Sequence, residues 1–145
     1  MAFHFTLEQV LRVRESIERS EELALQRAEM EVARVRRRIE ELTDLMASID
    51  RRREESLKKP LKAYELQGMD AEMNAATDAR LALLGTLKTV EELRDAQLTV
   101  YRTAHNGRQM LTDLEEEKRM EYEKEQTRAQ QKRLDDLFAA RIQRR

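Results

Sequence analysis

Residues 28–49 read AEMEVARVRRRIEELTDLMASI, and apolar side chains recur in this stretch every three or four positions. The series is Ala28, Val32, Val35, Ile39, Leu42, Met46 and Ile49, with spacings of 4, 3, 4, 3, 4 and 3. Such a repeat places these side chains on one stripe of an α-helix, and a stripe held over three heptads is typical of a coiled coil. The stretch therefore predicts a long helix that packs against another helix along a narrow seam.

The first helix is predicted to begin near the N-terminus of the chain. Thr6 and Gln9 have the spacing of a capping box, and Phe5 and Val10 have that of a hydrophobic staple, so the helix should begin at Leu7. From there to residue 28 the predicted stripe runs through Leu7, Val10, Ile17 and Ala24. Charged residues at positions 14 and 21 interrupt it, and we expect a weaker seam there.

A turn is predicted after residue 58. The only proline, Pro60, steers the preceding Lys59 away from helical dihedrals. Gly68 and Asp70 follow, and Asp70 is a good N-cap for a second helix. We expect helices over about 7–58 and 70–143, with the turn over about 59–69. A three-helix bundle broken at Gly107 is the alternative, but it would leave much of the first helix uncovered.

The predicted fold is all-α, a long two-helix antiparallel coiled-coil hairpin that forms a single domain over residues 1–145. A turn centred near residue 64 pairs residue i with about residue 128 − i. This register sets the run 36–38 against Glu91 and Glu92, Arg12 and Arg14 against residues 115–117, and residues 21–22 against Arg108. It also places Phe3 and Phe5 beside Tyr122. The remaining C-terminal residues should project as a single-helix overhang of about 30 Å.

Composition excludes several classes of protein. The 145 residues include 28 Lys or Arg and 29 Asp or Glu, with only 3 Gly and no Cys or Trp, which is typical of long helices. No apolar run reaches the length of a signal peptide or a membrane span, so a soluble protein is expected. The two histidines, His4 and His105, lie far apart, and no catalytic motif is present. We expect neither an enzyme nor a cofactor or metal site.

The arginine runs at 36–38 and 51–53 do not predict a nucleic-acid site, because acidic residues interleave with them and no aromatic platform accompanies them. The overhang is more informative. It is rich in basic residues, including Arg144 and Arg145, and it carries Leu134, Leu137 and Phe138 on one face. An apolar stripe on an unpaired helix favours docking to a partner.

Two blocks of the chain resemble the FliJ family of bacterial flagellar export proteins. The opening block, residues 1–15, has two aromatic residues flanking one residue, and then an apolar stripe with a Leu-x-x-Arg-Glu-like run. The closing block, residues 130–139, is similar to the closing Gln-Lys-x-apolar-Asp-Glu/Asp segment of that family. Residues 68–73 look like its turn. The aromatic residues that are common in the second helix of the family just after the turn are missing here, and Arg80 and Leu84 stand at these positions.

The resemblance implies a cytoplasmic, non-enzymatic component of the flagellar type III export apparatus, peripheral at the inner face of the membrane. It implies a stalk for the hexameric export ATPase that also contacts the export-gate protein and export chaperones. The residues that it implies for ATPase docking are Phe3, Phe5, Tyr122, Lys132, Arg133, Leu134, Leu137 and Phe138. The residues that it implies for the gate contact are Leu84 and Leu87.

Three other functions remain open from the sequence. The first is a homodimeric coiled-coil scaffold, which would double in mass relative to a monomeric stalk. The second is the stalk protein of a virulence type III secretion system, which shares the hairpin. The third is a peripheral membrane adaptor that acts through the basic tail.

Overall fold

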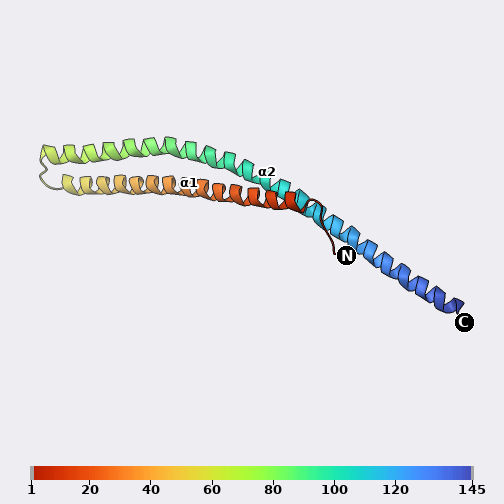
Figure 1. The fold of residues 1–145 in the computed structure, drawn as a ribbon. Helices are drawn as coiled ribbons and strands as arrows, with labels where there is room; N and C mark the ends of the chain where they lie inside the picture. The colour runs from red at the N-terminus through yellow and green to blue at the C-terminus, as the bar shows by residue number, and fades with distance from the viewer. Residues whose placement is uncertain (1, 145) are drawn as a thin grey trace. The chain divides into compact units, whose positions relative to one another are not determined.

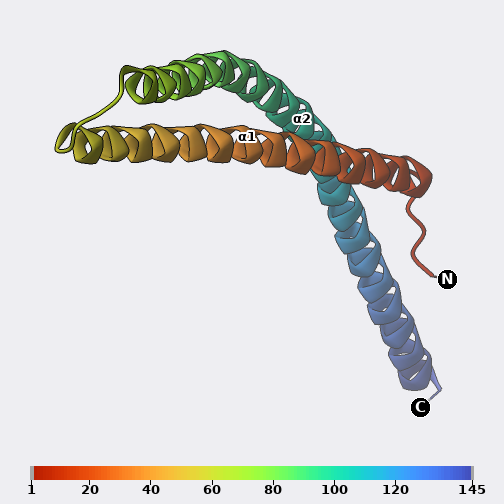
Figure 2. The same ribbon diagram turned by 90° about the vertical axis from the view of Figure 1, so that its left-hand side faces the viewer.

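The computed structural model describes residues 2–144, which form two long α-helices joined by a short turn (Figure 1 and Figure 2). Helix α1 spans Glu8–Leu57 and helix α2 spans Ala63–Gln143. The two helices form a hairpin, which confirms the predicted fold class. Met1, part of the predicted N-terminal block, and Arg145, part of the predicted basic tail, lie outside the described residues.

Helix α1 begins at Glu8, one residue later than predicted, and Thr6 and Leu7 form a turn before it. The Glu8 N–H donates to the Phe5 carbonyl oxygen at 3.2 Å, and the Leu11 N–H donates to the Leu7 carbonyl oxygen at 2.9 Å. Phe5 is buried, but its predicted staple partner Val10 is 44% exposed. The buried residue on this turn of α1 is Leu11 instead.

The stripe predicted for the N-terminal part of α1 is therefore wrong by one residue. Leu7, Val10 and Ile17 are exposed, whereas Leu11 and Leu25 are buried. The reason is the phase of the repeat: counting back from Val32 in steps of seven gives residues 25, 18 and 11. An uninterrupted heptad keeps these positions on the face that meets the partner helix. This phase brings Glu18 into the seam.

The turn is shorter than predicted, and α2 begins at Ala63 rather than at Asp70. Helix α1 ends in two hydrogen bonds between residues three apart: the Lys58 N–H donates to the Glu55 carbonyl oxygen and the Lys59 N–H to that of Ser56. Pro60 disfavours helix only at the residue before it, so the chain is free to re-enter a helix soon afterwards. Asp70 does not cap α2, because it lies inside the helix, where it pairs with Arg53 at 3.2 Å.

Helix α2 continues without a break through all three glycines of the chain, Gly68, Gly85 and Gly107. No glycine in the described part of the chain has a positive φ. The alternative of a three-helix bundle broken at Gly107 is thus not adopted.

The contacts divide the chain into two compact units, of which unit 2 comprises Glu21–Tyr101. Its seam buries Val32, Val35, Leu42 and Ile49 of α1, with Ile49 only 1% exposed. The side of α2 that meets them presents the small Ala76, which is also buried. The seam predicted from residues 28–49 is therefore confirmed.

Ion pairs between the helices of unit 2 test the predicted register. Arg36 pairs with Glu91 at 2.8 Å, within one residue of the predicted level. Arg52 pairs with Glu72 at 2.8 Å, four residues nearer to the turn than predicted, because the actual turn is shorter. Both pairs lie on exposed surface, where such pairs contribute up to about 1 kcal/mol each.

Unit 1 comprises the residues up to Ser20 and those from Arg102 onward. Phe5, Leu11 and Ala104 are its buried apolar residues. The predicted pairing of Arg108 with residues 21–22 is wrong, because Arg108 pairs with Glu18, which the heptad phase places in the seam. Arg12 pairs with Glu8 on its own helix rather than with residues 115–117.

Candidate functional site: an unpaired helix and the end of the hairpin

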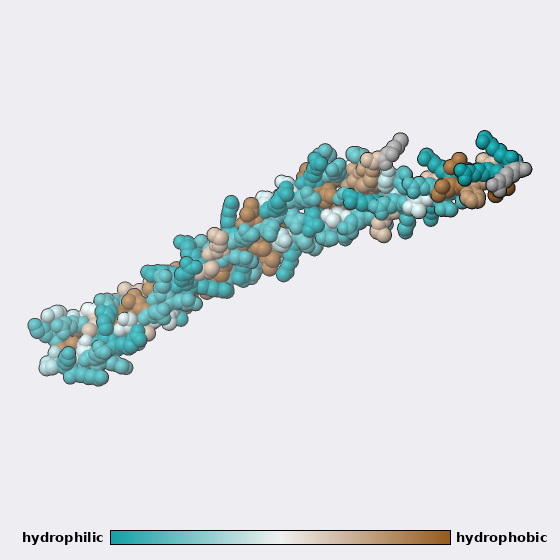
Figure 3. Space-filling model, turned by 90° about the horizontal axis from the view of Figure 1, so that it is seen from below, coloured by the Kyte–Doolittle hydropathy of each residue, from teal (hydrophilic) through white to brown (hydrophobic). Residues whose placement is uncertain are grey.

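Beyond Tyr122, every described residue of α2 is exposed. This segment, residues 123–144, is the predicted single-helix overhang. Figure 3 shows its apolar side chains in brown near the isolated end of the chain, among hydrophilic residues in teal. The large exposed apolar residues are Leu134 at 59%, Leu137 at 64%, Phe138 at 69% and Ile142 at 68%. Residues spaced three and four apart share one helix face, so they form a single apolar stripe.

Ile142 belongs to this stripe but was missing from the predicted site. Its spacing of four residues from Phe138 was the available signal. The two side chains line a shallow groove of about 450 Å³ together with Arg141 and Arg144. The far end of the overhang therefore combines an apolar face with two guanidinium groups.

The base of the overhang is formed by aromatic residues. The rings of Phe3 and Tyr122 have centroids 5.6 Å apart and planes inclined by 52°. The Arg119 guanidinium carbon lies over the ring of Phe3, 5.4 Å from the ring centroid. Phe5 is only 6% exposed, so it anchors the N-terminal segment and presents little surface to a partner.

The structure brings the eight predicted docking residues together in two places rather than one. Phe3, Phe5 and Tyr122 gather at the end of the paired helices. The group from Lys132 to Phe138 lies further along α2, and twelve residues separate Tyr122 from Leu134, which is about 18 Å along a helix. A partner that touches both groups must therefore follow the helix for some distance.

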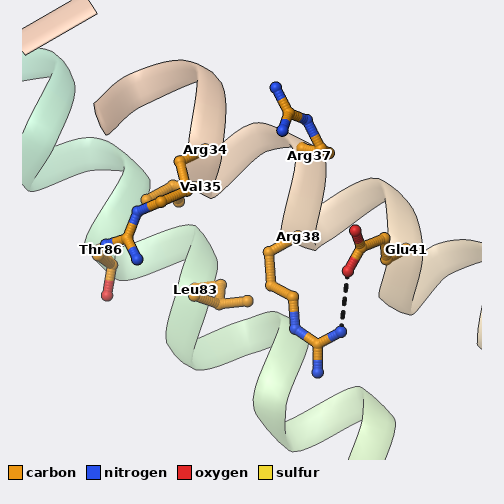
Figure 4. A pocket seen from close by; sticks show the side chains of 7 residues that line it. All are labelled: Arg34, Val35, Arg37, Arg38, Glu41, Leu83 and Thr86. Carbon is orange, nitrogen blue, oxygen red and sulfur yellow. Dashed lines mark hydrogen bonds and ion pairs between the residues drawn. The ribbon is translucent and has the colours of Figure 1, made fainter. Parts of the chain in front are cut away.

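The two predicted gate residues lie on α2 within unit 2. Leu84 is 38% exposed and Leu87 is half-buried. A groove of about 420 Å³ lies nearby, lined by Leu83 and Thr86 of α2 and by arginines of α1 (Figure 4). Arg38 donates to Glu41 at 3.0 Å, while Arg37 points away from α2. The groove is basic along its α1 side.

A polar cluster that the sequence analysis missed lies in the seam of unit 1. Glu18 accepts hydrogen bonds from Arg108, with Nε at 2.5 Å, and contacts His105 Nδ1 at 2.9 Å. The side chains of Glu18 and Arg108 are 15% and 20% exposed. The Arg108 hydrogen bond lowers the pKa of Glu18 below 4.5, against the opposing effect of burial. The available signal was the position of Glu18, which lies seven residues after Leu11 and seven before Leu25 and so shares their place in the heptad repeat.

The described residues include no cluster of three or more His, Asp or Glu side chains placed to hold a metal ion. Within residues 2–144, neither helix has a stretch that is long and apolar enough to span a membrane. The described surfaces carry apolar stripes flanked by charged residues on helices. Such surfaces suit the binding of other helices.

Comparison with known proteins identifies the family. The family model described as flagellar FliJ protein matches residues 3–145. No curated protein matched the chain, and no solved structure did. Because the family match covers nearly the whole chain, and because the fold is the expected helical hairpin, this chain belongs to the FliJ family and is a component of the flagellar export apparatus.

Proposed function

We propose that this protein is the stalk of the flagellar export ATPase, and that its overhang enters the pore of the hexameric ring. The observation that carries the proposal is that every residue from 123 to 144 is exposed, including Leu134, Leu137 and Phe138. A single helix with its side chains is about 10–12 Å across, so it fits a bore that excludes a globular domain. An apolar stripe of this size on an unpaired helix is typical of a docking face.

The two groups of predicted docking residues have different parts in this proposal. Leu134, Leu137 and Phe138, with Lys132 and Arg133 beside them, contact the walls of the pore. Phe3 and Tyr122 form the rim contact at the base of the overhang, and the buried Phe5 holds the N-terminal segment in place. The stalk then couples events in the ring to the rest of the export apparatus rather than catalysing a reaction.

ATPase turnover and ring assembly test this proposal. Wild-type protein should increase both when it is added to the purified export ATPase. Leu134→Asp and Phe138→Asp should abolish the increase while far-UV circular dichroism stays near that of the wild type, because both side chains are exposed. Leu81→Asp is the matched control, since Leu81 is 69% exposed on α2 but lies in unit 2.

Stimulation that survives both overhang variants would contradict docking through this segment. A collapse of helicity in these variants would show that the overhang is part of the fold, and it would count against the proposal equally.

We also propose that Leu84 and Leu87 contact the export-gate protein, which would hold the stalk at the inner face of the membrane while it escorts export chaperones. Leu84 is the more exposed of the two and is the residue to change. Leu84→Asp should weaken capture by the purified cytoplasmic part of the gate while ATPase stimulation remains. Unchanged gate binding would contradict this assignment.

A homodimeric scaffold is the second candidate, because the stripe at Leu134, Leu137 and Phe138 could also pair with the same stripe of another copy. Light scattering at micromolar concentration separates the two functions. A monomeric mass of 17.2 kDa supports the stalk, whereas a doubled mass that Phe138→Asp returns to the monomer supports the scaffold.

A further inference from the structure

The N-terminal part of α1 carries two stripes of residues that differ by one position. One stripe contains Leu11 and Glu18, which lie in the seam of unit 1, with 7% of Leu11 and 15% of the Glu18 side chain exposed. The other contains Val10, Val13 and Ile17, which are 44%, 58% and 42% exposed. The seam thus holds the carboxylate of Glu18 beside the buried Leu11, while three apolar side chains lie outside it. An ordinary amphipathic helix turns its apolar side chains toward its partner.

The repeat further along α1 explains which stripe faces α2. An unbroken heptad leads back from Val32 to positions 25, 18 and 11. The outer stripe can continue the same seam only if the alternation of three- and four-residue spacings is broken once. Two spacings of four must then follow one another, from Val32 to Ala28 and from Ala28 to Ala24, and steps of seven from Ala24 lead to Ile17 and Val10. Such a stutter unwinds the supercoil locally but leaves the helix intact. The two stripes therefore represent two rotational settings of the same helix.

Contacts with α2 hold the present setting. Glu18 Oε1 and Oε2 meet Arg108 Nη2 at 3.3 Å and Nε at 2.5 Å, and His105 Nδ1 lies 2.9 Å from Oε1. On the same turns, an added Cβ at Gly107 would lie 3.5 Å from Arg14 Nη1, so Arg14 also crosses to α2 in this setting.

The free-energy contributions that distinguish the two settings oppose one another. Drawing a carboxylate and a guanidinium out of water is unfavourable, and their attraction roughly offsets this. Burying Val10 and Ile17 would be favourable, because it removes apolar surface from water. The present setting gains an ion pair and buries Leu11 but leaves Val10 and Ile17 exposed, while the other would bury these two side chains and expose Leu11.

We propose that residues 8–20 of α1 form a rotational switch, in which the contact of Glu18 with Arg108 and His105 holds one setting. When this contact is lost, the segment turns by one heptad position, so that Val10, Val13 and Ile17 face α2 and Glu18 faces solvent. A partner that covers the outer stripe stabilises the present setting, and one that engages Glu18 or Arg108 stabilises the other. Binding at this end of the hairpin would then be converted into rotation of a helix.

Cysteine labelling tests this switch, because the chain contains no cysteine of its own. Ile17→Cys and Leu11→Cys are made separately, and the reaction of each with a small maleimide is timed. In an otherwise wild-type chain position 17 should react faster than position 11. Adding Glu18→Ala should reverse this order and lower the ratio of the two rates by about tenfold or more, because the contact that holds the partly buried Glu18 against Arg108 is then lost.

Two further variants make the result decisive. Glu15→Ala is the matched control, since Glu15 has no ion pair among the described residues, and it should leave the ratio unchanged. Glu18→Leu combined with Arg108→Leu makes the seam apolar and should keep position 17 reactive and position 11 protected. Helicity should stay constant throughout, because both settings are helical.

The switch is overturned if Glu18→Ala accelerates both positions, which would mean that the end of α1 frays. It is overturned equally if neither rate changes. The labelling needs no ATPase, so its failure is distinguishable from failure of the proposed stalk function.

Discussion

The ring of Phe3 packs against that of Tyr122, with centroids 5.6 Å apart, and Tyr122 is the last described residue of α2 that is partly buried. This contact joins the segment that precedes α1 to the point where α2 loses its partner. Tilted aromatic pairs contribute about 0.5–1.5 kcal/mol beyond their buried area. The pair therefore sets the boundary between the paired helices and the overhang.

Phe3→Ala should loosen this boundary without melting the hairpin. We expect the free energy of unfolding to fall by about 1 kcal/mol, because the ring contact with Tyr122 is lost. Amide hydrogen exchange over residues 5–12 should become faster, while helicity stays near that of the wild type. Phe138→Ala, which removes an exposed ring, is the control and should leave both measurements unchanged. Equal effects of the two variants would contradict the assignment.

Leu42→Asp should melt the seam of unit 2. Leu42 is 4% exposed, and truncating a buried leucine lowers the free energy of unfolding by roughly 2–5 kcal/mol. The aspartate also places an unpaired charge in the seam, which lowers it further. Urea unfolding followed by circular dichroism measures the loss. Leu45→Asp is the matched control three residues further along the same helix, where the side chain is 44% exposed. If both variants unfold at the same urea concentration, the seam is not the source of stability.

Much of the fold was predictable, because the seam from Val32 to Ile49 allows only one phase of the heptad. The N-terminal part of α1 was ambiguous, since Val10 and Leu11 are both apolar and adjacent. Choosing the apolar neighbours of Val10 gave a stripe that Arg14 and Glu21 interrupt, but the structure keeps the phase set by the regular repeat and accepts Glu18 in the seam. Local composition was therefore a poorer guide than the continuity of the repeat.

The turn was mislocated for a related reason. Asp70 has the chemistry of an N-cap, but its pairing with Arg53 inside the hairpin was invisible without the register. For the candidate site, the exposure of Leu134, Leu137 and Phe138 followed from the difference in length between the helices. Their docking to the ATPase stays a prediction, since it depends on a partner surface that one chain does not contain.

The ion pair of Glu18 should make stability depend on acid pH. Its pKa is lower in the folded protein than the ordinary 4.5, chiefly through the Arg108 hydrogen bond, so the unfolded chain takes up a proton first as the pH falls. The stabilisation is complete above about pH 4.5 and is lost as the pH falls through the folded pKa. Glu18→Gln should be less stable than wild type at neutral pH and should lose less stability on acidification.

Thermal unfolding at a series of pH values measures this difference. Glu15→Gln removes a carboxylate from the same part of α1 and is the control. If Glu18→Gln and wild type lose stability in parallel between roughly pH 5 and pH 3, the ion pair contributes nothing to the acid response.

Gly85→Ala should stabilise the protein. Gly85 lies in the interior of α2 without a positive φ, and a Cβ added there would meet nothing within 4 Å. Alanine restricts the unfolded chain more than glycine does, so the free energy of unfolding should rise by about 0.5–1 kcal/mol. Gly107→Ala should give a similar gain, since its Cβ would meet Arg14 Nη1 at an ordinary 3.5 Å. Differential scanning calorimetry measures both, and a lowered melting temperature for Gly85→Ala would mean that the backbone at this point is not the regular helix described.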